Sequence, residues 1–228
     1  RRPPRSTLDR SSAASDVYKR QRLISSETGL SSEKLRTGKL ANHEWEQLNV
    51  KVNSLEKAPL YVDDTPSLSI FDLRAKARRL RKRKKVELFV VDYLQLLNCS
   101  EFSRDGRQRE TMAISGAIKA LAKELNVPII VLSQLSRASE GRSENKPKLS
   151  DLRDSGAIEQ DADIVMLLYR SKYYNSDSDD NTAILDIAKY RHGSTGPISL
   201  TFIDTYTRFE NYAAEDDYSY SYNENNND

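Results

Sequence analysis

The chain of 228 residues carries 36 Lys and Arg against 34 Asp and Glu, so its formal net charge is only +2 at pH 7. A single cysteine excludes a disulfide framework or a cysteine-based zinc site built from this chain alone. No stretch approaches the roughly eighteen consecutive apolar residues of a membrane span, and no apolar signal segment opens the chain. We therefore expect a cytoplasmic protein with one ordinary domain and no membrane partner.

The two ends of the chain differ from the rest in composition. Residues 1–20 read RRPPRSTLDRSSAASDVYKR and show no hydrophobic periodicity, so we interpret them as a non-native or disordered arm. Residues 214–228 are rich in Asp, Asn, Ser and Tyr and have too little apolar surface to offset the entropy of ordering, which predicts a disordered acidic tail. The fold is expected in residues 21–213.

The first elements of that region are a helix and a short strand. Residues 42–57 place apolar side chains at helical spacing, with Asn42 as the expected N-cap; these side chains are Trp45, Leu48, Val52 and Leu55. Residues 60–62 form a short apolar run that predicts a strand. Ser69 followed by Asp72 resembles the acidic variant of a capping box.

The helix that Ser69 begins is strongly basic. Its apolar stripe comprises Ile70, Leu73, Ala77 and Leu80, and residues 74–85 read RAKARRLRKRKK. A basic run of this kind is either a solvated helix face or a contact surface for a phosphate backbone or a partner. The sequence leaves both interpretations open.

Two apolar runs follow, each ending at a polar side chain. Asp92 follows the first run, residues 88–91. A helix is predicted over residues 110–126, and the second run, residues 129–132, comes after it and is followed by Ser133 and Gln134. The predicted helix has one apolar face, made by Ile114, Ala117, Ile118, Leu121, Ala122 and Leu125. Runs without alternation are typical of strands buried on both faces of a parallel sheet.

The rest of the chain predicts further strands. Two short helical stretches near residues 150–160 precede the predicted strands 164–169, 184–188, 198–202 and 206–209. Gly193 and Gly196 mark the turn of an antiparallel hairpin. The whole pattern predicts an α/β fold, with a mostly parallel twisted sheet flanked by helices and closed by a C-terminal hairpin.

The polar residues at the strand ends are the first candidates for chemistry, because α/β sheets bind ligands beyond the carboxyl ends of their strands. A carboxylate after a buried apolar run, as at Asp92, suits a Walker B element that holds the Mg²⁺ of a bound nucleotide. An aspartate at a strand end is more often a turn or a helix cap. For Gln134 the alternative is a loop amide that caps its own backbone.

Four segments in order carry a resemblance: VVDYLQLL, LAKELNVPIIVLSQLSR, SDLRDSGAIEQDADIVMLLYR and IAKYRHGSTGPISLTFI. Together they resemble the motor domain of DnaB-type replicative DNA helicases, over about residues 22–212. The resemblance implies a RecA-like P-loop NTPase core and a homohexameric ring. It also implies ATP and Mg²⁺ as cofactors, 5′–3′ translocation on single-stranded DNA and unwinding at the replication fork. A primase and a helicase loader are the implied partners. The implied location of the protein is the cytoplasm, in association with the nucleoid.

The same resemblance implies roles for individual residues. Asp92 matches the Walker B aspartate, with indirect contact to Mg²⁺, and Gln134 matches a sensor of the γ-phosphate. Arg191 matches an arginine finger supplied to the next subunit, with Lys189 beside it; ordinary surface charge is the alternative for both. The residues expected to organise the loop between nucleotide and central channel are Glu159, Gln160 and Asp163.

Two loops are the expected DNA contacts. The loop 102–109 lies where the family has a DNA-facing loop, and its candidates are Arg104, Gly106 and Arg107. The long polar loop 136–150 is the second, with Arg137, Arg142 and Lys146 as candidates.

A phosphate-binding loop is missing from these residues. Gly38-Lys39 is the sole Gly-Lys pair, but Glu33 and Leu40 occupy the positions where the G-x-x-x-x-G-K-[ST] pattern needs Gly and Ser or Thr. We expect that loop upstream of Gln21, and we expect this chain alone neither to bind ATP tightly nor to hydrolyse it. One alternative is a RecA-like recombination or repair ATPase, but the motif KYRHGSTG favours the helicase. The other alternative is a non-catalytic module that binds nucleic acid through residues 74–85.

Overall fold

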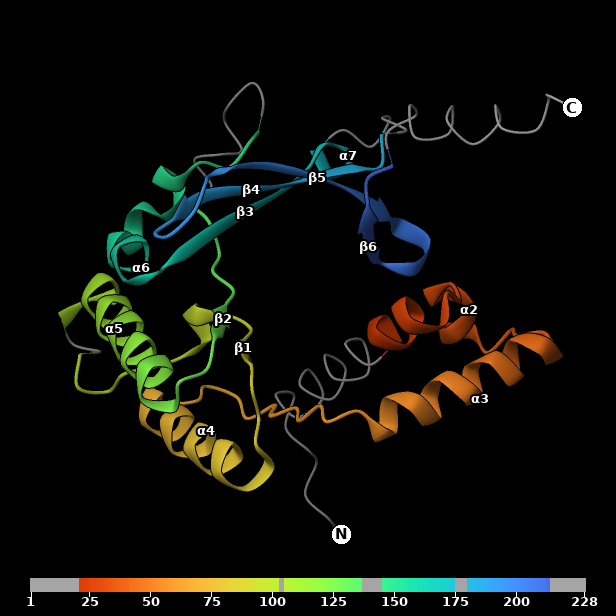
Figure 1. Ribbon diagram of the computed structural model, residues 1–228, viewed down its shortest axis with the longest axis horizontal. Helices are drawn as coiled ribbons and strands as arrows, with labels where there is room; N and C mark the ends of the chain where they lie inside the picture. The colour runs from red at the N-terminus through yellow and green to blue at the C-terminus, as the bar shows by residue number, and fades with distance from the viewer. Residues whose placement is uncertain (1–20, 103–104, 137–144, 175–179, 214–228) are drawn as a thin grey trace, which may run out of the picture.

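The computed structural model describes residues 21–102, 105–136, 145–174 and 180–213, so the expectations for the two terminal segments lie outside the described residues. Figure 1 shows helices packed on one side of a small parallel sheet, a curved antiparallel sheet beyond them, and a separate group of helices from the N-terminal part. This arrangement confirms the α/β class predicted from the sequence. None of the described helices is long and apolar enough to cross a bilayer.

The N-terminal group consists of a helical segment over residues 21–28, α2 (Ser32–Thr37) and α3 (Asn42–Lys57). The expected cap at Asn42 is wrong, because the N-cap is Ala41. The carboxylate of Glu44 accepts the Ala41 N–H at 2.9 Å and so does the capping, while Lys34 pairs with Glu44 and lowers the pKa of that carboxyl.

The predicted strand over residues 60–62 is also wrong: this part of the segment between α3 and α4 (Ile70–Lys84) is extended but pairs with no described strand. Its side chains are exposed instead of buried, since Val62 retains 76% of its accessible surface. An ion pair between Asp63 and Lys76 at 2.6 Å holds the segment along α4.

The small sheet pairs β1 (Phe89–Val91) with β2 (Ile129–Val131) in parallel, with Val91 opposite Val131. One face is covered by α4 and by α5 (Arg107–Leu125), and the core there comprises Ile70, Val91, Leu94, Leu97, Cys99, Ile114 and Ile118. The expectation of burial on both faces is wrong for the described residues. Val90 and Ile130 are 58% and 41% exposed because no described element covers their side of the sheet.

Local signals set the ends of the helices. Ser69 accepts the Asp72 N–H at 3.0 Å and begins α4, as the sequence predicts. Helix α5 begins three residues before its predicted start, because Gly106 at φ 95° turns the chain into it, and Asn126 in the left-handed region ends it.

The large sheet has the order β3-β4-β5-β6 and is antiparallel throughout. Its strands are β3 (Ile164–Arg170), β4 (Thr182–Tyr190), β5 (Gly196–Ile203) and β6 (Arg208–Asn211). The connections from β4 to β5 and from β5 to β6 are too short for anything but antiparallel pairing, since a parallel crossover needs a dozen residues or more. The predicted hairpin is thus confirmed, whereas a mostly parallel sheet is not what the described strands form.

Short helices fill the connections. They are η1 (Leu94–Leu96), η4 (Leu149–Ser155), α6 (Gly156–Asp161), α7 (Ser171–Tyr174) and η5 (Asp204–Tyr206). The pair η4 and α6 matches the two helical stretches expected near residues 150–160. In the β4–β5 turn, a Cβ on Gly193 would collide with the ring of Tyr190 in the position that it occupies.

Candidate active site at the strand ends

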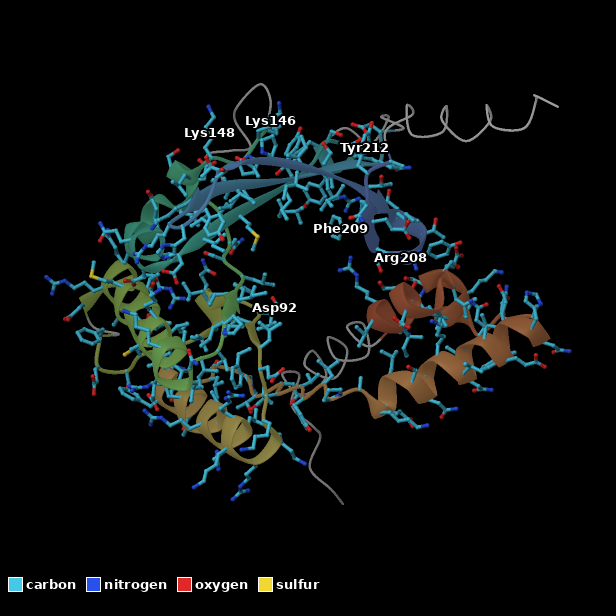
Figure 2. The ribbon with its side chains drawn as sticks, viewed as in Figure 1. Asp92, Lys146, Lys148, Arg208, Phe209 and Tyr212 are labelled. Atoms are coloured by element: carbon cyan, nitrogen blue, oxygen red, sulfur yellow. The ribbon has the colours of Figure 1, made fainter. Side chains whose placement is uncertain are left out.

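Asp92 and Gln134 follow neighbouring parallel strands. Asp92 comes directly after β1, and the pairing with β2 continues past both strands, since Leu132 N–H donates to Val91 O and Leu94 N–H to Leu132 O, each at 2.9 Å. Both candidates therefore lie at the same edge of the sheet, where α/β proteins bind ligands. Figure 2 shows Asp92 at the end of β1, on the side facing the middle of the molecule.

The side chain of Gln95 fixes the backbone of Gln134. Its Oε1 accepts the Gln134 N–H at 3.2 Å, and its Nε2 donates to Gln134 O at 3.3 Å and to Ser133 Oγ at 3.1 Å. The side-chain amide of Gln134 is exposed and makes no hydrogen bond within the part of the chain that the structure describes. It does not cap its own backbone and is available to a ligand.

Gln95 was not among the residues that the sequence singled out. The sequence does contain a feature that could have indicated it: Gln95 is a polar residue within the apolar segment VVDYLQLL, three residues after Asp92. Its partners lie 38 and 39 residues further on, so only the folded chain shows what it binds.

Gln95 is also linked to the start of α5. Arg107 donates from Nη2 to the carbonyl of Gln95 and from Nη1 to Glu110 Oε2 at 2.8 Å. Glu110 is buried, and its other oxygen accepts the Cys99 N–H at 2.9 Å. Arg107, a predicted DNA contact, thus connects the loop after β1 to α5, although half of its side chain remains exposed.

A second group of predicted residues gathers where α6 meets the β4–β5 hairpin. Lys189 donates to the carbonyl of Glu159, and Arg191 donates to the carbonyl of Gln160 at 2.5 Å. The Arg191 backbone N–H also donates to Asp163 O at 3.0 Å, and its guanidinium lies 3.5 Å from the Asp163 carboxylate. The structure brings these five residues together, although the sequence assigned the basic pair and the three residues of the 159–163 segment to different roles.

Helix α5 supports this second group. Lys119 pairs with Asp163 and is the main reason why the pKa of that carboxyl is lowered; Arg191 and His192 add to the effect. Ser115 donates to Asp161 at 2.7 Å, so α5 holds both the last residue of α6 and Asp163, which follows the helix. The same helix starts at the loop that Arg107 holds, so it joins both groups of candidates.

The remaining predicted DNA contacts are placed only in part. Gly106 is the N-cap of α5, and Lys146 is exposed at the start of the segment that leads to η4. In Figure 2, Lys146 and Asp92 lie well apart, on either side of the long strands of the large sheet. Arg104, Arg137 and Arg142 lie outside the described residues.

The C-terminal domain model of DnaB-like helicases matches residues 10–211 of this sequence. The chain belongs to the DnaB-like helicase C-terminal domain family. The match begins inside the segment 1–20 that we interpreted as a foreign or disordered arm, and it covers all the described residues except the last two.

Among curated relatives in this DnaB-like family, the replicative DNA helicase DnaB of Geobacillus stearothermophilus is 48% identical over 191 residues. The replicative DNA helicase DnaC of Bacillus subtilis is 43% identical over 191 residues. Each alignment covers 83% of this chain but only 42% of the relative, so the chain spans less than half the length of these helicases.

Solved structures of the DnaB-like family support the same placement. One of them, an ATPase domain, superimposes with a TM-score of 0.78 at 35% identity, over 85% of this chain and 69% of that one. A DnaB-like replicative helicase described with its interactions with primase gives the same score and identity over 47% of its length. The RecA-like core that the sequence predicted is therefore shown.

Proposed function

We propose that this chain is the motor portion of a replicative DNA helicase that couples ATP hydrolysis to 5′–3′ translocation on single-stranded DNA and to duplex unwinding. The observation that carries the proposal is the position of Asp92 and Gln134 at adjacent ends of two parallel strands. A carboxylate and a free amide at that edge suit a nucleotide triphosphate, which offers a metal ion and phosphate oxygens to bind.

Asp92 fits the requirements of Mg²⁺. This ion is usually held by one or two carboxylates, by waters and by the phosphates of a substrate, so one exposed aspartate is a sufficient protein contribution. No group of three metal-ligating side chains occurs among the described residues, which agrees with a site that the nucleotide completes. When bound there, Mg²⁺ would neutralise charge developing on the phosphates.

The cradle for the phosphates is not built from the described residues. Gly38, in the Gly-Lys pair, is the left-handed C-cap that ends α2, and no strand leads into it. A P-loop needs backbone amides between a strand and the start of a helix. The ATPase activity thus belongs to the longer protein of which this chain is the motor portion.

Arg191 and Lys189 act on the nucleotide of a neighbouring subunit in this proposal. Both side chains are anchored to carbonyls of α6, so they form a basic pair that is held between the hairpin and that helix. Within a homohexamer, Arg191 would stabilise charge on the phosphoryl group of the next subunit. Glu159, Gln160 and Asp163 position the pair.

The DNA contacts remain proposals for the same motor. Arg104, Gly106 and Arg107 form the first loop, and Arg137 and Lys146 belong to the second. Arg107 is hydrogen-bonded to Gln95, and Gln95 is hydrogen-bonded to Gln134. A DNA contact at the first loop would therefore shift the position of Gln134, the proposed γ-phosphate sensor. We further propose a cytoplasmic place at the replication fork, with primase and a helicase loader as partners.

The test uses the full-length helicase that carries this segment, with DNA-stimulated ATP turnover and strand displacement as readouts. Asp92→Asn and Gln134→Ala should abolish displacement while binding of single-stranded DNA persists. Unwinding should require a 5′ tail on the fork. Normal displacement by either variant, or a requirement for a 3′ tail, would overturn the proposal.

A further inference from the structure

The solvent face of α4 is a strongly basic surface whose charge is only partly neutralised. Toward its N-terminal half, Arg74 and Arg78 share Glu124 of α5, with two Arg78 contacts of 2.5 and 2.7 Å, and Lys76 pairs with Asp63. Toward the C-terminal end of α4, the described residues supply no acidic partner to the basic side chains. Arg79, Lys82, Arg83, Lys84 and Lys85 are all exposed, and none has an acidic partner within the described residues.

An exposed aromatic ring lies beside these cations. Tyr61 is 44% exposed, and Lys84 Nζ lies 5.7 Å from the centre of its ring. The segment that carries Tyr61 is held along α4, because Lys76 donates to Thr65 Oγ1 at 2.7 Å and pairs with Asp63. These contacts hold the chain close to Tyr61 alongside α4, so the ring lies next to the basic side chains.

We propose that this surface, Tyr61 with the basic residues at the end of α4, binds single-stranded nucleic acid. Basic residues three and four apart on a helix lie about 5–6 Å from each other, so Arg79, Lys82 and Arg83 form a row that can follow successive phosphates. An exposed ring adds a stacking surface, which an unpaired base can use and a base inside a duplex cannot. This combination favours a single strand over an acidic peptide.

The surface is distinct from the proposed motor site. Helix α4 leads into the start of β1, whereas Asp92 follows the end of that strand, and the two regions lie apart in Figures 1 and 2. The inference goes beyond the proposed function because it uses neither the strand ends nor the loops 102–109 and 136–150. It predicts binding without nucleotide and without a ring of subunits.

The first test measures anisotropy of a fluorescein-labelled oligothymidylate with the 228-residue chain. A variant in which Arg79, Lys82, Arg83 and Lys85 become Gln should bind roughly 10²-fold more weakly at about 0.1 M salt. Its slope of log K against log salt should fall by about 3, since each phosphate contact contributes about 0.7. These side chains are exposed, and circular dichroism checks that the fold persists.

A matched variant removes the same charge elsewhere, at exposed side chains that form no ion pair among the described residues: Arg36, Lys39, Lys57 and Lys123, each to Gln. Its affinity should stay within about twofold of the parent, given that it keeps the row on α4. Equal weakening by both variants would mean that only net charge matters and would overturn the proposal. Loss of binding by Arg104→Ala with Arg107→Ala, but not by the α4 variant, would also overturn it and leave the motor proposal standing.

The second test isolates the ring. Tyr61→Ala should weaken oligothymidylate binding by about tenfold, because stacking on one base contributes about 1–3 kcal/mol, and Tyr61→Phe should restore it. Inorganic polyphosphate, which has no bases, should bind both variants equally. Equal effects on polyphosphate, or equally tight binding of duplex DNA, polyglutamate or anionic vesicles by the parent chain, would overturn the assignment to single strands.

Discussion

Gln95 holds Gln134 by both of its backbone groups, accepting the N–H at 3.2 Å and donating to the carbonyl at 3.3 Å. The carbonyl of Gln95 itself accepts from Arg107 at the start of α5. One residue therefore joins the loop after β1, the loop after β2 and the edge of the expected DNA-facing loop. This gives a physical route by which DNA contact can bias the position of a residue proposed to sense the γ-phosphate.

Removing the Gln95 amide should uncouple ATP turnover from DNA. In the full-length helicase, Gln95→Ala leaves the Gln134 backbone without these bonds, each of which contributes about 1 kcal/mol. We expect DNA-stimulated kcat to fall about tenfold or more, since small misplacements of a positioned group are costly. The KM for ATP should change little.

The control for this prediction is Asn53→Ala, which truncates an exposed amide on α3 with no hydrogen bond from its side chain among the described residues. It should leave both parameters unchanged. If Gln95→Ala instead lowered basal and DNA-stimulated turnover by the same factor, Gln95 would be a structural residue with no part in the coupling.

Arg191 should act across a subunit boundary. Arg191→Ala should lower kcat by roughly 10³–10⁵-fold, the range seen for arginine fingers, and Asp92→Asn should also inactivate the ring. When the two inactive variants are mixed and reassembled, some interfaces combine an intact Asp92 with an intact Arg191. ATP turnover should then reappear.

The control is each variant taken alone through the same reassembly procedure, which should restore no ATP turnover. A mixture that stays inactive, although native mass spectrometry shows mixed rings, would contradict action in trans.

The sequence predicted the elements that carry the strand-end site. The apolar runs before Asp92 and Gln134 predicted β1 and β2 within one residue at each end, and two strand ends in a parallel pair must share an edge. Local pattern was sufficient here because each strand is specified by a continuous apolar run. The assignments of function to Asp92, Gln134 and Arg191 came from the family resemblance and stay predictions.

What the sequence missed depends on contacts distant along the chain. Residues 60–62 have the apolar pattern of a strand, but an ion pair with α4 holds their segment as an unpaired extended chain. The cap of α3 depends on Glu44, which lies inside the helix, and not on the amide of Asn42. Gln95 gains its role from a loop that lies 39 residues further along.

The 228-residue chain alone should not turn over ATP. The residues that it contributes at the strand ends can bind a metal ion and contact a phosphate, but the amide cradle and lysine of a P-loop are not among them. We expect no phosphate release above the buffer background, with or without single-stranded DNA, and no saturable ATP binding at micromolar concentrations. Measurable DNA-stimulated turnover by the purified chain would contradict this prediction.

The ion pair of Asp63 with Lys76 predicts a pH-dependent stability. The hydrogen bond from Lys76 lowers the pKa of Asp63 from 3.8 to about 2, with Thr65 adding to the effect. Because the folded-state pKa is depressed, the stabilisation is present above about pH 3.8 and is lost as the pH falls through about 2. The Asp63 side chain is 40% exposed, so solvent screening limits the contribution to about 1 kcal/mol or less.

Asp63→Asn should therefore lower the melting temperature by up to about 2–4 °C near neutral pH and by much less near pH 2, measured by circular dichroism across that range. The neighbouring Asp64→Asn removes a carboxylate that forms no ion pair among the described residues and serves as the control. Raising the salt concentration should shrink the Asp63→Asn effect, since an exposed pair is screened. An effect that persists unchanged at pH 2 would show that packing, and not the ion pair, holds this segment against α4, and it would weaken the case that Tyr61 lies beside the basic row.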